Sequence, residues 1–190
     1  MASPAVPAWV PLPPPPEAAV GAARFAVRPA ALADAAAITA VQVASWRSAY
    51  RTMLPAPTLA AMSPRDPGRI ARRRELLGGS GLNLVAVDTT HGDVVGYAQA
   101  GPSRRAGPAV GELYELYLLD RARRFGLGTE LFAGFAAWNR AGGSRAMIVW
   151  VLEPNHPARR FYEALGGVRD GRVHSHVGGF PVVELSYVWR

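Results

Sequence analysis

The sequence lacks two residue types entirely, cysteine and lysine. Without cysteine the chain can form no disulfide bond, no thiolate metal site and no acyl-cysteine intermediate, so covalent catalysis through a thiol is excluded. Without lysine there is no ε-amino group that could serve as a Schiff-base nucleophile. All 21 basic side chains are therefore arginines.

The chain also lacks long apolar runs and is short of acidic residues. A membrane helix needs roughly 18 or more consecutive apolar residues, and none occurs although 49% of the residues are apolar. We therefore expect no membrane association, and a length of 190 residues fits one ordinary domain. The formal charge of +7 favours a phosphate-rich ligand or a nucleic acid, but a coding bias toward Arg, Ala, Pro and Gly explains it equally well.

Residues 1–23 differ in composition from the rest of the chain. They contain seven prolines and a single charged side chain, Glu17. Such a segment can neither form a helix nor bury a core, so we predict a disordered tail at 1–23 and a globular domain at 24–190. The segment has no positively charged start, and prolines interrupt its apolar stretches, so it does not resemble a secretory signal. The expected location is the cytoplasm.

Apolar spacing and Gly or Pro breaks divide residues 24–190 into strands and helices. The expected strands are 24–28, 82–87, 94–100, 110–119, 146–152, 168–176 and 181–189, with a loop at 101–109. The expected helices are 31–45, 67–77, 126–141 and 157–165. The resulting order, β-α-α-β-β-β-α-β-α-β-β, indicates an α/β protein with a mixed sheet.

The segment between the strand at 110–119 and the following helix has the composition of an anion-binding loop. It reads Arg123-Arg124-Phe125-Gly126-Leu127-Gly128-Thr129. Glycines let the backbone approach a ligand closely, and the free N–H groups and dipole of a new helix attract negative charge. With two arginines beside them, these groups suit a pyrophosphate.

A Gly-x-Gly sequence alone is also compatible with a tight turn that packs a helix against a sheet. Two other nucleotide-binding loops fail on specific residues. A dinucleotide fingerprint requires a third glycine where Leu131 stands. A P-loop requires a lysine, which the chain lacks. The pyrophosphate cradle and the simple turn both remain open at this point.

Two motifs in the same order resemble those of the GNAT superfamily of N-acetyltransferases. The motif Arg/Gln-x-x-Gly-x-Gly/Ala, which follows a long strand, is matched by Arg123, Gly126 and Gly128. The motif Asn-x-x-Ala-x-x-Phe-Tyr-x-x-x-Gly is matched by Asn155, Ala158, Phe161, Tyr162 and Gly166. The order of elements agrees with the family from residue 24 onward. The resemblance implies a mostly antiparallel sheet of about seven strands with helices on both faces.

The resemblance also implies a reaction and a cofactor. A family member would transfer the acetyl group of acetyl-CoA directly to a primary amine of a small molecule or peptide. The residues that this implies for cofactor binding are Leu116, Tyr117, Leu118, Arg123, Arg124, Phe125, Gly126, Leu127, Gly128, Thr129, Asn155, Ala158 and Phe161. An alternative is a non-catalytic domain that binds or senses acyl-CoA. We expect no nucleic-acid partner, because the arginine run at 65–74 has no interleaved aromatic residues.

The chemistry of amide formation suggests catalytic candidates. An amine of pKa about 10 is neutral only to roughly one part in a thousand at pH 7, so a base or a water chain must take its proton. Glu112 and Glu115 precede the loop, and Glu112 is preferred because related histone acetyltransferases have a glutamate at this distance. On a regular strand these two side chains face opposite ways unless a bulge intervenes. Tyr162 is the candidate donor to the leaving thiolate, with simple packing as the alternative.

The acceptor is not identified by any motif. Trp46, Arg47 and Tyr50 follow the first helix, where family members build the acceptor pocket, although they equally fit core packing. His174 and His176 have no evident third ligand, so we expect no metal site. An aminoglycoside, an amino acid, a polyamine and a protein N-terminus all remain open, with strongly cationic acceptors disfavoured by the net charge. The sequence also leaves a homodimer open.

Overall fold

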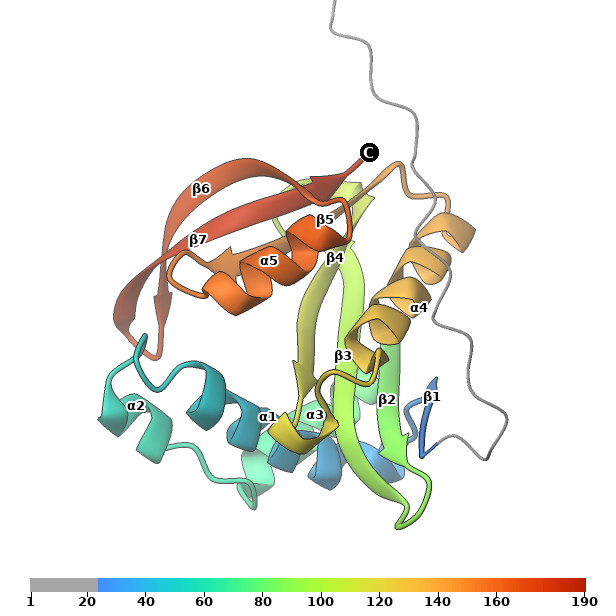
Figure 1. Ribbon diagram of the computed structural model, residues 1–190, viewed down its shortest axis with the longest axis vertical. Coiled ribbons are helices and arrows are strands. Elements are labelled where there is room, and N and C mark those ends of the chain that lie inside the picture. The colour runs from blue at the N-terminus through green and yellow to red at the C-terminus, as the bar shows by residue number, and fades with distance from the viewer. Residues whose placement is uncertain (1–23) are drawn as a thin grey trace, which may run out of the picture.

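Seven strands form one sheet within residues 24–190, the part of the chain that the computed structural model describes; the tail predicted at 1–23 lies outside it. The strand order is β1-β2-β3-β4-β5-β7-β6 (Figure 1). The strands are β1 (Phe25–Pro29), β2 (Leu82–Asp88), β3 (Asp93–Ser103), β4 (Gly107–Leu118), β5 (Ala146–Leu152), β6 (Val168–Val177) and β7 (Phe180–Trp189). The helices are α1 (Ala35–Ala49), α2 (Ala56–Ala60), α3 (Pro67–Leu77), α4 (Leu127–Ala141) and α5 (His156–Ala164).

All neighbouring strands are antiparallel except β4 and β5, which run parallel. This mixed, mostly antiparallel sheet confirms the predicted fold class. The parallel pairing is short, extending only from Val110 opposite Ala146 to Leu113 opposite Val149. Beyond this pairing β4 continues to Leu118. The remaining residues of β5 pair only with β7, on the other side of the strand. The sheet is therefore open between its two central strands.

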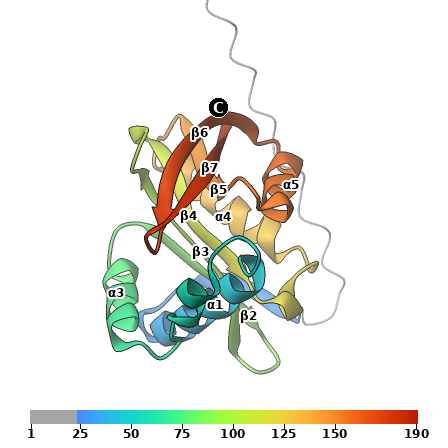
Figure 2. The ribbon, with the colours of Figure 1, turned by 90° about the vertical axis from the view of Figure 1, so that its left-hand side faces the viewer.

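Helices cover both faces of the sheet, with α4 and α5 on one face and α1 and α3 on the other (Figures 1 and 2). On the first face Leu131, Phe132 and Phe135 of α4 are fully buried among residues of the central strands. On the second face Ile38 and Val41 of α1 pack in a separate cluster against β2 and β3. The central strands are thus buried between two apolar layers, as such a layered architecture requires.

A β-bulge interrupts the ladder between β3 and β4. Gln99 lies opposite Glu115, but its neighbour Ala100 lies opposite Leu113, so Tyr114 is an extra residue on β4. Because strand side chains alternate between faces, one extra residue reverses the alternation beyond it. The bulge therefore brings Glu112 and Glu115 to the same face, that of α1 and α3.

The structure corrects two details of the predicted elements. The loop expected at 101–109 is mostly strand, because β3 runs to Ser103 and β4 begins at Gly107. Its prolines are tolerated because Pro102 adjoins a second irregularity in the β3–β4 ladder. The short helix α2 was not predicted; Pro57 lies in its first turn, where a missing N–H costs nothing. Within residues 24–190 there is also no helix with the length and hydropathy to cross a membrane.

Candidate functional site

A cavity of about 630 Å³ opens where β4 and β5 separate. Its walls come from the second half of β4, the centre of β5, the start of α4, and α5. Because β5 pairs with β4 only as far as Leu113, the β5-facing backbone edge of residues 114–118 has no ladder partner on that side in the described chain. Such an edge can take an extended ligand as an added strand.

Most of the residues predicted to bind a cofactor line this cavity. They are Leu116, Tyr117, Leu118, Arg123, Arg124, Gly126, Gly128, Thr129, Asn155, Ala158 and Phe161. The two others lie differently. The Phe125 side chain is exposed and contacts Phe25 with the two rings tilted by 57° and their centroids 5.0 Å apart. Leu127 is the first residue of α4, and its side chain is buried in the core. These two positions contribute to the loop through their backbone.

The loop at the start of α4 has the geometry of an anion cradle. Arg124 and Gly126 have φ angles of 68° and 79°, in the left-handed region that a side chain other than glycine rarely adopts. The first N–H groups of α4 have no partner within the helix, and Gly126, Gly128 and Thr129 of this segment line the cavity. A Cβ atom on Gly128 would lie 3.3 Å from the Phe161 ring, so the glycine also allows α5 to pack closely.

Asn155 begins α5 as its N-cap. Its Oδ1 accepts a hydrogen bond of 3.2 Å from the Ala158 backbone N–H. The side chain is buried beside the cavity. The asparagine of the second motif therefore fixes the start of the helix that carries Phe161 and Tyr162.

Replacement of Asn155 by Ala is expected to lower the free energy of unfolding by about 1 kcal/mol, the usual cost of losing an N-cap. Chemical denaturation checks this value. Asp66→Ala is the matched control, because Asp66 caps α3 away from the cavity by accepting from Gly68 and Arg69. We expect a similar loss of stability in both variants and weaker acetyl-CoA binding only in Asn155→Ala. Equal stability of Asn155→Ala and the parent chain would contradict the capping role.

Tyr162 lies on α5 between the core and the cavity. Its side chain is buried, and its ring contacts Phe161 and Phe132 at centroid distances of 5.1 and 6.2 Å. Burial raises the pKa of the Tyr162 phenol well above its usual range, so the hydroxyl stays protonated near neutral pH. Within residues 24–190 this hydroxyl has no hydrogen-bond partner. It is a protonated donor with free capacity at the cavity wall.

Glu115 also lines the cavity, and its carboxylate is held by three donors. Oε2 accepts from the Tyr97 hydroxyl at 2.5 Å and from the Arg73 guanidinium at 2.8 Å. Oε1 accepts from Gln42 Nε2 at 3.0 Å. The Arg73 side chain is only 6% exposed and that of Glu115 22%, so the cation of this pair is buried and the carboxylate partly buried. A carboxylate has about four acceptor positions, which leaves room for one more donor such as a water molecule.

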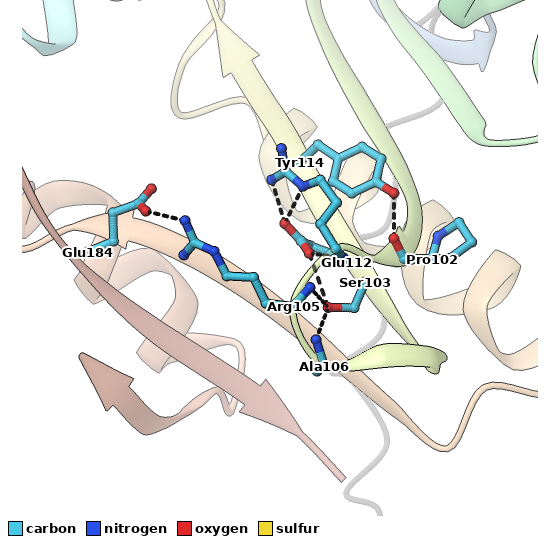
Figure 3. Close-up of polar contacts among 8 residues, drawn as sticks. Pro102, Ser103, Arg105, Ala106, Glu112, Tyr114 and Glu184 are labelled. Atoms are coloured by element: carbon cyan, nitrogen blue, oxygen red, sulfur yellow. Dashed lines mark hydrogen bonds and ion pairs between the residues drawn. The ribbon is translucent and has the colours of Figure 1, made fainter. Parts of the chain in front are cut away.

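Glu112, the glutamate preferred from the sequence, is not among the residues that line the cavity. Its buried carboxylate accepts from Ser103 Oγ at 3.1 Å and from the Arg104 backbone N–H at 2.8 Å, and it pairs with the Arg104 guanidinium (Figure 3). These donors saturate the carboxylate and anchor the β3–β4 turn. The preference for Glu112 as a base is therefore corrected, because Glu112 lies opposite Ile148, where β4 and β5 are still paired, and only Glu115 lines the cavity.

The three predicted acceptor-site residues are separated by the structure. Tyr50 lines the cavity, and its hydroxyl lies 3.0 Å from that of Tyr117. Trp46 instead packs edge-on against Tyr50 in a cluster with α2. Arg47 donates to the carbonyl groups of Leu59 and Met62, at 3.4 and 2.7 Å, and so joins α1 to α2. Neither Trp46 nor Arg47 lines the cavity.

Sequence reasoning missed the partners of Glu115. Arg73 belongs to the arginine run at 65–74, yet it is buried and also donates to Gln99 at 3.0 Å. The spacing offered a signal, since Arg73 follows Ile70 by three residues and precedes Leu77 by four. Leu77 packs against the cluster of α1, β2 and β3, and helix geometry places Arg73 on the same side.

Comparison with known proteins gives consistent matches. The acetyltransferase (GNAT) family model matches residues 43–167. YuaI of Bacillus subtilis (strain 168), described as an uncharacterized N-acetyltransferase, is 32% identical over 164 residues, covering 86% of this chain and 91% of that protein. PaiA N-acetyltransferase of Thermoplasma acidophilum, solved with coenzyme A, has a TM-score of 0.65 at 16% identity and covers 85% and 97% of the two chains. A phosphinothricin acetyltransferase of Sinorhizobium meliloti, solved with acetyl-CoA, has a TM-score of 0.66 at 24% identity and covers 87% of each.

Proposed function

Because this chain belongs to the acetyltransferase (GNAT) family, we propose that it transfers the acetyl group of acetyl-CoA directly to a primary amine held in the cavity between β4 and β5. The observation that carries the proposal is the convergence of three features on that cavity. These are an unpaired strand edge, an anion cradle and a protonated tyrosine.

The residues of the cavity fit the chemical parts of acetyl-CoA. When bound, this cofactor supplies an activated acetyl thioester. The N–H groups that begin α4, together with Arg123 and Arg124, would hold the pyrophosphate. The free edge of residues 116–118 would pair with the amide groups of the pantetheine arm. A side chain at position 128 would press against the Phe161 ring. Glycine at this position therefore leaves the backbone open to close approach by a ligand.

Glu115 is the better-placed group for handling the proton of the amine. Arg73, Tyr97 and Gln42 donate hydrogen bonds to its carboxylate and fix it in position. Because three of its acceptor positions are occupied, we propose that it receives the proton through a water molecule at the remaining position. Its negative charge also favours the approach of an ammonium ion.

Tyr162 would act on the leaving sulfur. The raised pKa of its phenol makes full proton transfer to a thiolate unfavourable, since a thiol has a pKa of about 8.5. A hydrogen bond from a fixed, buried donor still stabilises the negative charge that develops on sulfur. We therefore assign Tyr162 as a hydrogen-bond donor to the thiolate rather than as a source of a free proton.

Initial-rate kinetics tests the proposal. With acetyl-CoA and an amine varied together, release of the CoA thiol should give intersecting lines, because direct transfer requires both substrates to be bound at once. Parallel lines would indicate a covalent acetyl-enzyme and contradict direct transfer. The alternative of a non-catalytic acyl-CoA-binding domain predicts a different result: acetyl-CoA binding in calorimetry without transfer to any amine of a broad panel.

A further inference from the structure

Two adjacent arginines of the β3–β4 turn lie over two aromatic residues that line the cavity. The Arg104 guanidinium carbon lies 4.5 Å from the centroid of the Tyr114 ring. The Arg105 guanidinium carbon lies 4.5 Å from the centroid of the Trp150 ring. Tyr114 and Trp150 belong to β4 and β5, on either side of the opening between these strands. Neither arginine lines the cavity itself, but each lies against an aromatic residue that does, so two cationic groups lie beside this entrance.

This entrance faces away from α4. Val149 and Val151 pack in the core beneath α4, so the side chain of Trp150 between them points to the opposite face. Glu184 of β7 lies on that face for the same reason, since its neighbour Leu185 lies in the core. The cradle at the start of α4 would bring the cofactor from one face. The second substrate would then enter from the other face, past the arginines.

The turn holds both arginines in place. Ser103 Oγ accepts from the backbone N–H groups of Arg105 and Ala106, at 3.3 and 3.0 Å, and itself donates to Glu112 (Figure 3). Arg105 Nη2 donates to Glu184 Oε2 at 2.9 Å. A guanidinium stacked on an aromatic ring and tied to a carboxylate loses little further freedom when it binds an anion.

At this entrance the arginines have unused hydrogen-bond donors, whereas the carboxylates are all paired. Each of the carboxylates here is already paired with an arginine: Glu112 with Arg104, Glu115 with Arg73 and Glu184 with Arg105. The side chain of Arg105 is nevertheless 42% exposed. Its Nε and Nη1 groups donate to no residue within 24–190. The entrance thus has spare cationic donors and no spare carboxylate for a second ammonium group.

From this arrangement we propose that the acceptor is a small amine that also carries a carboxylate, as an amino acid does, and that Arg105 binds this carboxylate. The inference rests on the proposed acetyl transfer and specifies its acceptor. The aromatic rings of Tyr50, Tyr114 and Trp150 at the cavity wall would contact an apolar side chain of such an acceptor. Polyamines lack the carboxylate and would meet the arginines as like charges.

Matched acceptor pairs test the proposal with the full chain. Free α-amino acids, their α-carboxamides and their decarboxylated amines are assayed by CoA thiol release over a pH series, with kcat/KM expressed per neutral amine. We expect the best amino acid to exceed its own carboxamide and decarboxylated amine by about 10- to 100-fold, as for loss of a charge-assisted hydrogen bond. Equal or better transfer to the amines without a carboxylate would overturn the inference and leave acetyl transfer standing. Transfer to no amine of either kind would overturn both.

Variants of the arginine separate a binding role from a structural one. Arg105→Gln should raise KM for the best amino acid about tenfold and leave the carboxamide unchanged. Glu184→Gln should lower KM for the amino acid, because it releases Arg105 from its carboxylate. Arg172→Gln is the control, since Arg172 is similarly exposed and paired with Glu153 but extends from β6 on the other face of the sheet. If Arg105→Gln and Glu184→Gln change KM in the same direction, the anion-binding role is wrong.

Discussion

Replacement of Tyr162 by Phe is expected to lower kcat about 100-fold or more, with little change in the affinity for acetyl-CoA. The variant keeps the buried ring and its contacts with Phe161 and Phe132. It removes only the hydroxyl, which would be used when charge develops on sulfur. Loss of one fixed donor to a developing anion commonly costs about 10²- to 10³-fold in kcat. Steady-state kinetics together with calorimetric titration of acetyl-CoA measures both quantities.

Tyr187→Phe is the matched control for this variant. Tyr187 is a buried tyrosine near Tyr162, but its hydroxyl donates to Glu163 at 2.7 Å and accepts from Arg159 at 3.1 Å instead of facing the cavity. We expect Tyr187→Phe to lose about 1 kcal/mol of stability while kcat stays the same. If kcat also stays unchanged in Tyr162→Phe, Tyr162 is a packing residue and has no role at the sulfur.

The second large effect is expected at the buried ion pair of Arg73 and Glu115. Replacement of Glu115 by Leu leaves the Arg73 cation buried without its counter-ion, with the Arg73 side chain only 6% exposed. Breaking a buried pair in this way costs about 3–5 kcal/mol of the free energy of unfolding. Chemical denaturation with equal m-values for variant and parent would measure the loss directly.

The double variant Arg73→Leu/Glu115→Leu distinguishes stability from catalysis. Removing both charges removes the unpaired cation, so we expect most of the lost stability to return. A double variant that folds but has greatly reduced kcat would support the role of Glu115 in accepting the proton. A double variant that folds and retains the parent kcat would contradict that role. The ion pair would then serve only to join α3 to β4.

The sequence predicted the sheet well because its strands have strong local signals. The apolar run at 146–152 and the arginine-rich helix predicted at 67–77, which begins at Pro67, coincide with β5 and α3. The ends of β3 and β4 next to their connecting turn were harder to predict. Glycine and proline at 101–102 and 107–108 indicated a loop, yet pairing with a neighbouring strand kept both segments extended. Local composition does not report such long-range pairing.

The site divides in the same way. The cradle and the Asn155 motif are continuous in sequence, and nearly all of their predicted residues line one cavity. The environment of the two glutamates depends on residues far away along the chain. Arg73 of α3 holds the carboxylate of Glu115 in place. A one-residue bulge in β4 determines on which face of the sheet Glu112 lies. Neither the bulge nor the buried arginine can be derived from spacing within β4.

The early end of the pairing between β4 and β5 also affects how long the folded chain would survive in a cell. Among residues 24–190 no strand pairs with the β5-facing edge of residues 114–118, so a bound ligand would complete the central sheet there. A ligand that binds only the folded chain at a hundredfold excess over its Kd adds about 2.7 kcal/mol to the free energy of unfolding. A lower acetyl-CoA concentration would remove this stabilisation as well as the substrate. A larger fraction of the chain would then be unfolded and open to proteases. Its abundance would thus follow the supply of its own acetyl donor.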